Sequence, residues 1–307
     1  MSKCVFLNPQ TCGIYKNGGP RYRTDASTGR RTDEIDNELK EHVAAYLAGR
    51  RVAGMAKVSV STAFRNNNLV PTYYDERYNA SIRELVERLG VEAVSVGDML
   101  DEGWITVRGG HGSPGNDQRS GTVPYIKVSD IRGMRVNINP TNLVPESVAN
   151  RLWRSESSGL QAWDLITPNR ASSNIGEFAV LLPSEEKIVV TKEVFVFRVV
   201  DETLFNHFYL LWALSLKAVR EQWRRVALMQ TNREDCGSRW KEILLPKPPS
   251  AEWAEDVAKA FKEYFSTIAD AKPAFLEAIA SDGNEYIPSV YSSAPVELEH
   301  EDGDEIQ

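Results

Sequence analysis

Charged and hydroxyl-bearing side chains gather behind a short apolar run in "GTVPYIKVSDIRGMRVN", residues 121–137. The run 123–128 predicts a half-buried strand, because its apolar residues are rich in β-formers. Cations can neutralise phosphates, and arginine, serine and aspartate can also bond to base edges. The same residue types are common at the solvated end of an ordinary strand. The segment therefore indicates either a nucleic-acid contact or a plain surface turn. The polar residues in question are Lys127, Ser129, Asp130, Arg132 and Arg135.

The chain has few residues in the patterns that catalysis or metal binding requires. The stretch "GGHGSPGN", residues 109–116, lacks the glycine spacing and the Lys-Ser/Thr ending of phosphate-binding loops, so we interpret it as a turn. The four histidines have no metal-ligand spacing. Glu185 and Lys187 form a Glu-x-Lys pair like that of nucleases, without a well-placed upstream aspartate. No Asn/Asp-Pro-Pro-aromatic motif, by which amino-methylating enzymes grip a flipped base, is present. We predict that the chain does no covalent chemistry alone.

The length of 307 residues allows one large domain or two modest ones. Residues 251–307 hold 3 Lys/Arg against 14 Asp/Glu, which leaves 33 against 29 in residues 1–250, although the net charge is −7. An acidic end on a slightly basic body is compatible with DNA binding but does not demand it. The apolar runs fall short of the roughly 18 residues of a membrane span. With three cysteines and no signal-like N-terminus, we expect a cytoplasmic protein.

Periodicity and turn residues predict the elements that would position these side chains. An apolar strand and a glycine-punctuated hairpin at 13–24 precede a helix from Glu34 to about Leu47, capped by Thr32 or Asp33. A strand begins near 55, a second helix covers 79–89, and a long helix covers 204–228. The buried stripe of the first helix is predicted to be Ile35, Leu39, Val43 and Leu47. The clearest strands are predicted near 104–108, 123–128, 178–182 and 187–199.

A further helix is predicted over 252–280, interrupted or kinked at Pro273. Its apolar residues approximate a 3-4 repeat, so it would pair with another helix in a coiled-coil-like manner or pack on its own domain. The acidic tail from 281 is predicted to be disordered. Together these elements predict an α+β fold with a mostly antiparallel sheet, followed by a long dimerisation or spacer helix. The stripe consists of Trp253, Val257, Phe261, Tyr264, Phe265, Ile268 and Phe275.

Three strings resemble parts of a target recognition domain from type I restriction-modification specificity subunits. "WITVRGGHGSPGNDQRSGTVPYIKVSDIRG" (104–133) is similar to its opening strand, variable glycine-rich loop and Pro-Tyr-Ile-Lys/Arg segment. The strand pair that follows in such domains resembles "NRASSNIGEFAVLLPSEEKIVVTKEVFVFRV" (169–199). Their proline-rich exit, which precedes a long helix, resembles "ILLPKPP" (243–249). The resemblance covers about 90–280. Such subunits usually carry two recognition domains, whereas this chain has room for one.

The N-terminal strings "VFLNPQTCGIYKNGGPRYRTD" (5–25) and "NLVPTYYDERY" (68–78) resemble the region just after the catalytic domain of N6-adenine DNA methyltransferases. The two resemblances together imply a non-catalytic specificity subunit of a phage-defence system. Its implied partners are double-stranded DNA, a methyltransferase that would carry S-adenosylmethionine, a restriction or translocase subunit, and a second copy through 252–280. The implied domains are a methyltransferase-docking region (1–90), a recognition domain (91–250), a coiled-coil-like helix (251–280) and an acidic tail (281–307).

Polar loops between strands supply the predicted DNA contacts, because such loops vary without disturbing a core. No catalytic residue, metal ligand or bound cofactor is expected, and the basic hairpin at 16–31 would grip phosphates or dock the methyltransferase. Two alternatives remain: a decoy that binds the methyltransferase or nuclease without reading DNA, and a nuclease that uses Glu185 and Lys187. The predicted DNA-binding residues are Arg108, Arg119, Lys127, Ser129, Asp130, Arg132, Arg135, Arg170, Ser172, Asn174, Gln230, Thr231 and Arg233.

Overall fold

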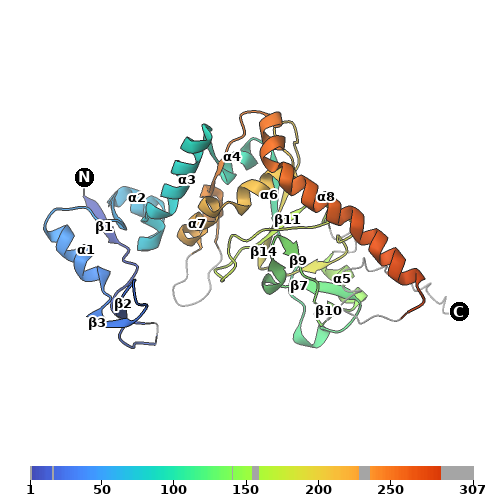
Figure 1. Cartoon of the computed structure of the whole chain (residues 1–307), viewed down its shortest axis with the longest axis horizontal. Helices are drawn as coiled ribbons and strands as arrows, with labels where there is room; N and C mark the ends of the chain where they lie inside the picture. Colours follow the sequence, from blue (N-terminus) through green and yellow to red (C-terminus); the bar gives the residue numbers. More distant parts are fainter. Residues whose placement is uncertain (1, 16, 140, 154–158, 228–235, 285–307) are drawn as a thin grey trace.

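The computed structural model describes residues 2–15, 17–139, 141–153, 159–227 and 236–284 (Figure 1). In the described part of the chain, five sheets and a long C-terminal helix confirm the α+β class with mostly antiparallel strands. In the largest sheet every neighbouring pair is antiparallel except β12 and β9. Among the described residues, no helix is both long enough and apolar enough to span a membrane. The six strands of this sheet, in spatial order, are β6 (Ile105–Gly109), β14 (Val194–Val199), β11 (Leu165–Pro168), β12 (Ala179–Val180), β9 (Arg135–Val136) and β8 (Ile131–Arg132).

The smaller sheets join segments that are distant in the sequence. β5 pairs with β15, so the chain around residue 94 meets the chain around residue 245. The three-stranded sheet places β7 between β10 and β13, and β13 runs parallel to β7. These strands are β1 (Lys3–Leu7), β4 (Met55–Ser59), β2 (Tyr22–Thr24), β3 (Arg31–Ile35), β5 (Ala93–Ser95), β15 (Leu244–Pro246), β10 (Leu143–Val144), β7 (Val123–Ile126) and β13 (Val189–Val190). The two remaining pairs are β1 with β4 and β2 with β3.

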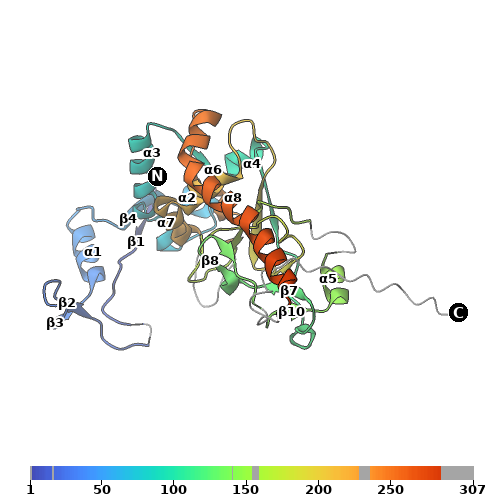
Figure 2. The same ribbon diagram turned by 45° about the vertical axis from the view of Figure 1, so that its right-hand side comes forward.

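Helices cover one face of the large sheet and extend away from it (Figures 1 and 2). α3 packs against α7, and α6 packs against α8. α8 runs from beside α6 toward β7 and β10. The helices are α1 (Glu38–Leu47), α2 (Val60–Arg65), α3 (Arg77–Leu89), α4 (Val96–Asp101), α5 (Glu146–Leu152), α6 (His207–Ser215), α7 (Lys217–Val226) and α8 (Ala251–Ser281). The 3₁₀ turns are η1 (Pro71–Tyr74), η2 (Asn116–Gln118), η3 (Val128–Asp130) and η4 (Arg239–Glu242).

The alternation of β14 builds a core on each face of the large sheet. Successive side chains of a strand point to opposite faces. Phe197 therefore packs under the helices in the main core, whereas Val194 and Val196 join a second core with Ile126 and Val190. Because both faces carry apolar side chains, the sheet is a fixed platform for the loops at its edges.

The structure corrects the prediction for the first helix. Residues 31–35 form β3, paired with β2, and α1 begins only at Glu38. Asn37 caps it by accepting a hydrogen bond from the backbone N–H of Lys40, so the predicted caps Thr32 and Asp33 are wrong. The predicted stripe is not buried either, since the side chains of Ile35, Leu39, Val43 and Leu47 are 39% to 78% exposed. The helix face that packs inward carries His42 and Ala45.

Two further helix predictions change in detail. The expected helix 204–228 is broken at Leu216, whose ψ of 133° is extended, and this break lets α6 pack on α8 while α7 packs on α3. α8 is continuous through Pro273. Its first half packs on its own domain, because Phe265 is buried in the main core, whereas Tyr264 and Phe275 are more than half exposed.

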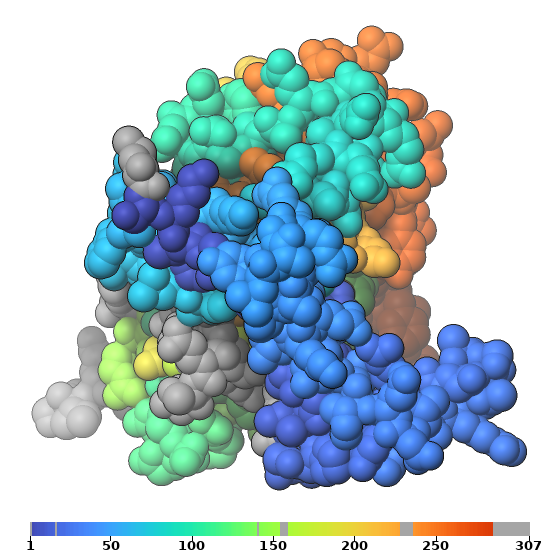
Figure 3. Space-filling view, turned by 90° about the vertical axis from the view of Figure 1, so that its left-hand side faces the viewer, coloured from blue at the N-terminus to red at the C-terminus, as the bar shows by residue number. Residues whose placement is uncertain are grey.

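The N-terminal segment forms a lobe at one end of the molecule (Figure 3). A polar network ties it to the body: the Tyr73 hydroxyl donates to Glu242 at 2.8 Å, and Arg225 donates to the same carboxylate at 2.8 Å. Burial and the bond to Glu242 raise the pKa of Tyr73 to about 12. α3 itself shares the main core with the sheet, since Ile82 and Leu85 pack there.

Candidate nucleic-acid interface

A cleft of about 500 Å³ opens at the edge of the three-stranded sheet. Parallel strands end at the same edge, so the residues after β7 and after β13 lie side by side, and the N–H of Thr191 donates to the carbonyl of Ile126 at 2.9 Å. The cleft gathers four segments that are up to 80 residues apart in the sequence. Its lining residues are Ser113, Arg119, Tyr125, Lys127, Val128, Ser129, Arg132, Ser172, Ser173, Asn174, Thr191 and Glu193.

The glycine-rich loop 109–116 contributes Ser113 to the lining of this cleft. The N–H of His111 donates to the carbonyl of Val190 at 2.9 Å, and His111 Nδ1 accepts from the N–H of Val190 at 3.0 Å. Gly110 lies so close to Thr191 that a Cβ at position 110 would be 2.0 Å from the carbonyl oxygen of Thr191. A side chain at position 110 is therefore excluded, and the loop is fixed on β13. His111 therefore has a structural role in holding the loop on β13.

Three cations lie in the cleft. Arg119 is exposed, and its guanidinium lies 5.9 Å from the ring centroid of Tyr125. Lys127 Nζ lies 6.0 Å from the same centroid and donates to the side-chain oxygen of Asn142. Arg132 is about half exposed, at the far side of the turn. Two of the cations thus lie near one aromatic ring, whereas Arg132 Nη1 lies 3.6 Å from Glu177 Oε2.

Two of the predicted contact residues hold the turn after β7 in shape. Asp130 is 7% exposed, and its carboxylate accepts from the backbone N–H of Lys127 at 2.8 Å. Asn174 is 3% exposed, and its amide donates to the carbonyls of Val128 at 2.7 Å and Ile131 at 3.3 Å. Its amide oxygen accepts from the Ser172 hydroxyl at 2.9 Å. In this structure Asn174 is committed inside the protein, where it clamps the loop 172–174 to the turn.

An ion pair lies at the border of the cleft. Arg170 follows β11, and its Nη1 lies 2.6 Å from Glu193 Oε1. Arg170 is among the residues predicted from the sequence, but Glu193 is not, because a lone glutamate in "TKEVFVFRV" has no motif around it. Its polar position directly before an apolar strand is the signal that could have found it.

Two predicted arginines lie away from the cleft. Arg108, in β6, is half-buried near Asp164 and Arg198, and burial lowers its pKa from the ordinary value. Arg135, in β9, lies 3.6 Å from Glu185 on the side that faces α8. The remaining predicted residues, Gln230, Thr231 and Arg233, are outside the part of the chain that the structure describes.

The Glu-x-Lys hypothesis receives no support from the placement of its carboxylate. Glu185 is 5% exposed, accepts from the backbone N–H of Leu182 at 3.0 Å and pairs with Lys272 at 2.7 Å. Lys187 is exposed. Within the described residues, no group of three or more His, Cys, Asp or Glu is arranged to hold a metal ion.

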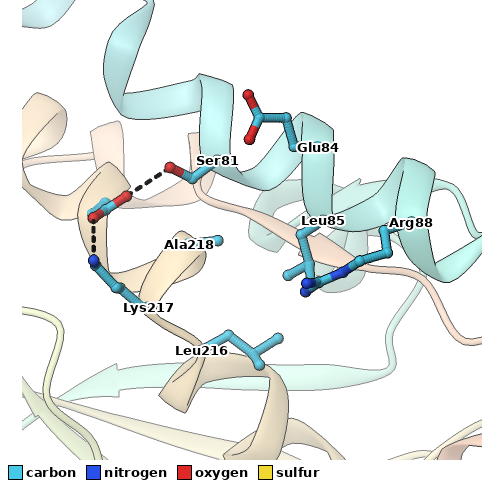
Figure 4. Close-up of a pocket in the computed structure, with 8 residues that line it drawn as sticks. Ser81, Glu84, Leu85, Arg88, Leu216, Lys217 and Ala218 are labelled. Atoms are coloured by element: carbon cyan, nitrogen blue, oxygen red, sulfur yellow. Dashed lines mark hydrogen bonds and ion pairs between the residues drawn. The ribbon is translucent and has the colours of Figure 1, made fainter.

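A second hollow of about 480 Å³ lies between α3 and α7 (Figure 4). The Ser81 hydroxyl donates to Glu221 at 2.8 Å, and Lys217 lies 3.8 Å from the same carboxylate. Glu84 and Arg88 add one charge of each sign. The balanced charges distinguish this hollow from the cleft, and it contains none of the predicted DNA-binding residues.

No family model and no curated protein matches the chain. Among solved structures, it is similar to the type I restriction-modification S subunit from M. genitalium (11% identity, TM-score 0.39, covering 62% of this chain and 41% of that one). It is also similar to the HsdS subunit from Thermoanaerobacter tengcongensis (12% identity, TM-score 0.37, covering 82% of this chain and 59% of that one). A third similar structure is that of the type IIG restriction endonuclease BpuSI (10% identity, TM-score 0.42, covering 68% of this chain and 30% of that one). The chain thus spans 30% to 59% of the length of these proteins.

Proposed function

We propose that this chain is a sequence-specific double-stranded DNA-binding subunit of a restriction-modification or related phage-defence system. The observation that carries the proposal is the cleft, which brings Arg119, Lys127 and Arg132 together with five serine and threonine side chains. Cations and hydroxyls are the groups that proteins use on phosphates and sugars, and the same groups reach base edges. The strings 104–133 and 169–199, which resemble parts of a target recognition domain, include the segments that line this cleft.

The three cleft cations would set the register of the protein on the duplex through phosphates. Ser129 and Ser172 line the same cleft and would add hydrogen bonds. Asn174 and Asp130 would act indirectly, because their side chains hold the turn and the loop that carry the other groups. Recognition would then depend on a surface that the sheet keeps rigid.

The chemistry on the DNA would belong to a partner, an N6-adenine methyltransferase that binds S-adenosylmethionine. The exposed apolar face of α1 supports docking of that partner on residues 1–90, because exposed apolar clusters mark interaction surfaces. Ile14 and Tyr15, on the neighbouring hairpin, are also more than half exposed. The hairpin arginines 21–31 would flank the docked partner.

A second copy and a restriction or translocase subunit would complete the assembly. Tyr264 and Phe275 of α8 are 59% and 54% exposed, which supports pairing of two α8 helices. Two copies related by a twofold axis would read two half-sites.

The test is selection of bound duplexes from a random library by the purified chain, alone and with an N6-adenine methyltransferase from the same organism. We expect a short enriched motif and a binding constant that falls steeply with salt, because phosphate contacts release counterions. Flat enrichment in both arms, with an intact complex, would reject the proposal. Tight methyltransferase binding without DNA binding would identify the decoy instead.

A further inference from the structure

Among the described residues that line the cleft, Glu193 is the one carboxylate beside the cations and hydroxyls. The Glu193 side chain is 37% exposed, the Arg170 side chain is 35% exposed, and 2.6 Å separates Glu193 Oε1 from Arg170 Nη1. An ion pair this exposed adds little to stability, because water screens both charges. A carboxylate also repels phosphates. The position of Glu193 in the proposed DNA cleft therefore calls for a ligand other than the phosphate backbone of the DNA.

The two residues are held by the large sheet rather than by a free loop. Arg170 follows β11 and Glu193 precedes β14, and the register pairs Pro168 with Val194. The N–H of Asn169 donates to the carbonyl of Glu193 at 3.0 Å, which continues this pairing by one step. Both backbones are therefore fixed, and the pair presents a guanidinium and a carboxylate side by side.

This arrangement complements one base pair in the major groove. Guanine presents two acceptors there, N7 and O6, and the amino group of its partner cytosine lies next to them as a donor. Arginine donates to the guanine acceptors, and glutamate accepts from the cytosine amino group. An A·T pair places its donor between two acceptors and would leave one of the protein groups facing a like group.

We propose that Arg170 and Glu193 together read one G·C base pair of the target, Arg170 on guanine and Glu193 on cytosine. The inference rests on the proposed DNA-binding function and assigns the base-reading role within it. Glu193 is then a specificity residue, whereas Arg119, Lys127 and Arg132 provide affinity that does not depend on sequence.

The experiment compares selected motifs for the full-length wild type, Glu193→Ala, Glu193→Gln and Arg170→Ala. We expect the wild-type motif to contain a fixed G·C pair, and both Glu193 variants to lose about ten-fold preference at that position while keeping the rest of the motif. Removal of the carboxylate should leave binding to random duplex unchanged or slightly tighter. Glu255→Ala, which removes an exposed carboxylate on α8, is the matched control.

The outcomes separate the two levels of the proposal. A wild-type motif that both Glu193→Ala and Arg170→Ala leave unchanged, or one without a G·C pair, would overturn the base-reading role and leave the DNA-binding function standing. Absence of any wild-type motif would overturn the function itself. Unfolding curves of each variant show whether a loss of binding reflects a loss of fold.

Discussion

Lys272 of α8 and Glu185 form a buried ion pair, with 2.7 Å between Lys272 Nζ and Glu185 Oε1, although 87 residues separate them in the sequence. Their side chains are 10% and 4% exposed. Arg135 lies 3.6 Å from the same carboxylate, and the backbone N–H of Leu182 donates to it. The pair fastens the second half of α8 to the segment between β12 and β13.

Lys272→Met should lower the free energy of unfolding by about 3 kcal/mol, because the Glu185 carboxylate stays buried but loses the nearer of its two positive partners. Urea denaturation measures this change. Lys259→Met is the control: Lys259 and Glu263 are exposed and 3.9 Å apart, so the change there should stay below about 0.5 kcal/mol. Equal small losses in both variants would show that the pair does not fasten α8.

The triple variant Arg119→Ala, Lys127→Ala, Arg132→Ala should bind duplex DNA more weakly and with a shallower salt dependence. If each cation neutralises one phosphate, the slope of log K against log salt should shrink by about 3. Fluorescence anisotropy across a salt series measures it. Arg83→Ala, an exposed arginine of α3, should leave the slope unchanged, and an unchanged slope in the triple variant would exclude phosphate contact by the cleft.

Gly176→Ala should destabilise the protein by about 2–4 kcal/mol. Its φ of +73° disfavours any side chain, and an added Cβ would lie 2.4 Å from Cδ1 of the buried Trp223. Gly90→Ala shares the left-handed backbone at φ +67° but has open space around it, so it should cost about 1–2 kcal/mol. The difference between the two variants in urea denaturation isolates the clash. A difference near zero would mean that Trp223 gives way freely.

His207 should make the protein less stable in mild acid. Burial lowers the pKa of His207 below its ordinary value of 6.5, although Glu202, 3.5 Å away, acts against this. The ring stacks on Trp163, and Lys262 of α8 disfavours the charged form as well. Because the unfolded chain takes up the proton first, the free energy of unfolding should fall as pH decreases below about 6.5.

The matched variants for this pH dependence are His207→Gln and Glu202→Gln. His207→Gln should flatten the stability profile between pH 7 and 5, since it removes the titrating group. Glu202→Gln should steepen it, because the imidazolium then loses its favourable neighbour. Denaturation series at several pH values decide the matter, and a wild-type profile that is already flat would contradict the prediction.

The apolar face of α1 should matter for partner binding more than for folding. Leu39→Ser and Val43→Ser change exposed side chains, so each should alter the free energy of unfolding by less than about 0.5 kcal/mol. Capture of the methyltransferase by the double variant should fall at least about ten-fold if these side chains anchor it, since anchors cost about 2 kcal/mol or more. Ala45→Ser, on the inward face, is the reverse control and should lower stability instead. Unchanged capture would place the docking surface elsewhere.

The sequence predicted the elements whose signals are local. α3 and α8 are long amphipathic segments, and the strands β6, β7 and β14 combine β-formers with turn residues at their ends. The same local signals failed for residues 31–35, because pairing with β2 outweighed helix periodicity there. They also failed at Leu216, where the helix breaks because α6 packs on α8 and α7 packs on α3.

By itself the sequence determined the α+β class, the cationic and hydroxyl-bearing segments, and the strings that resemble parts of a recognition domain. Only the tertiary structure decided which of those side chains share a cleft, because the parallel pairing of β7 with β13 brings together segments from different parts of the chain. It also assigned Asn174 to the scaffold and brought Glu193 beside Arg170. These arrangements depend on contacts between residues that are far apart in the sequence, so local sequence patterns do not predict them.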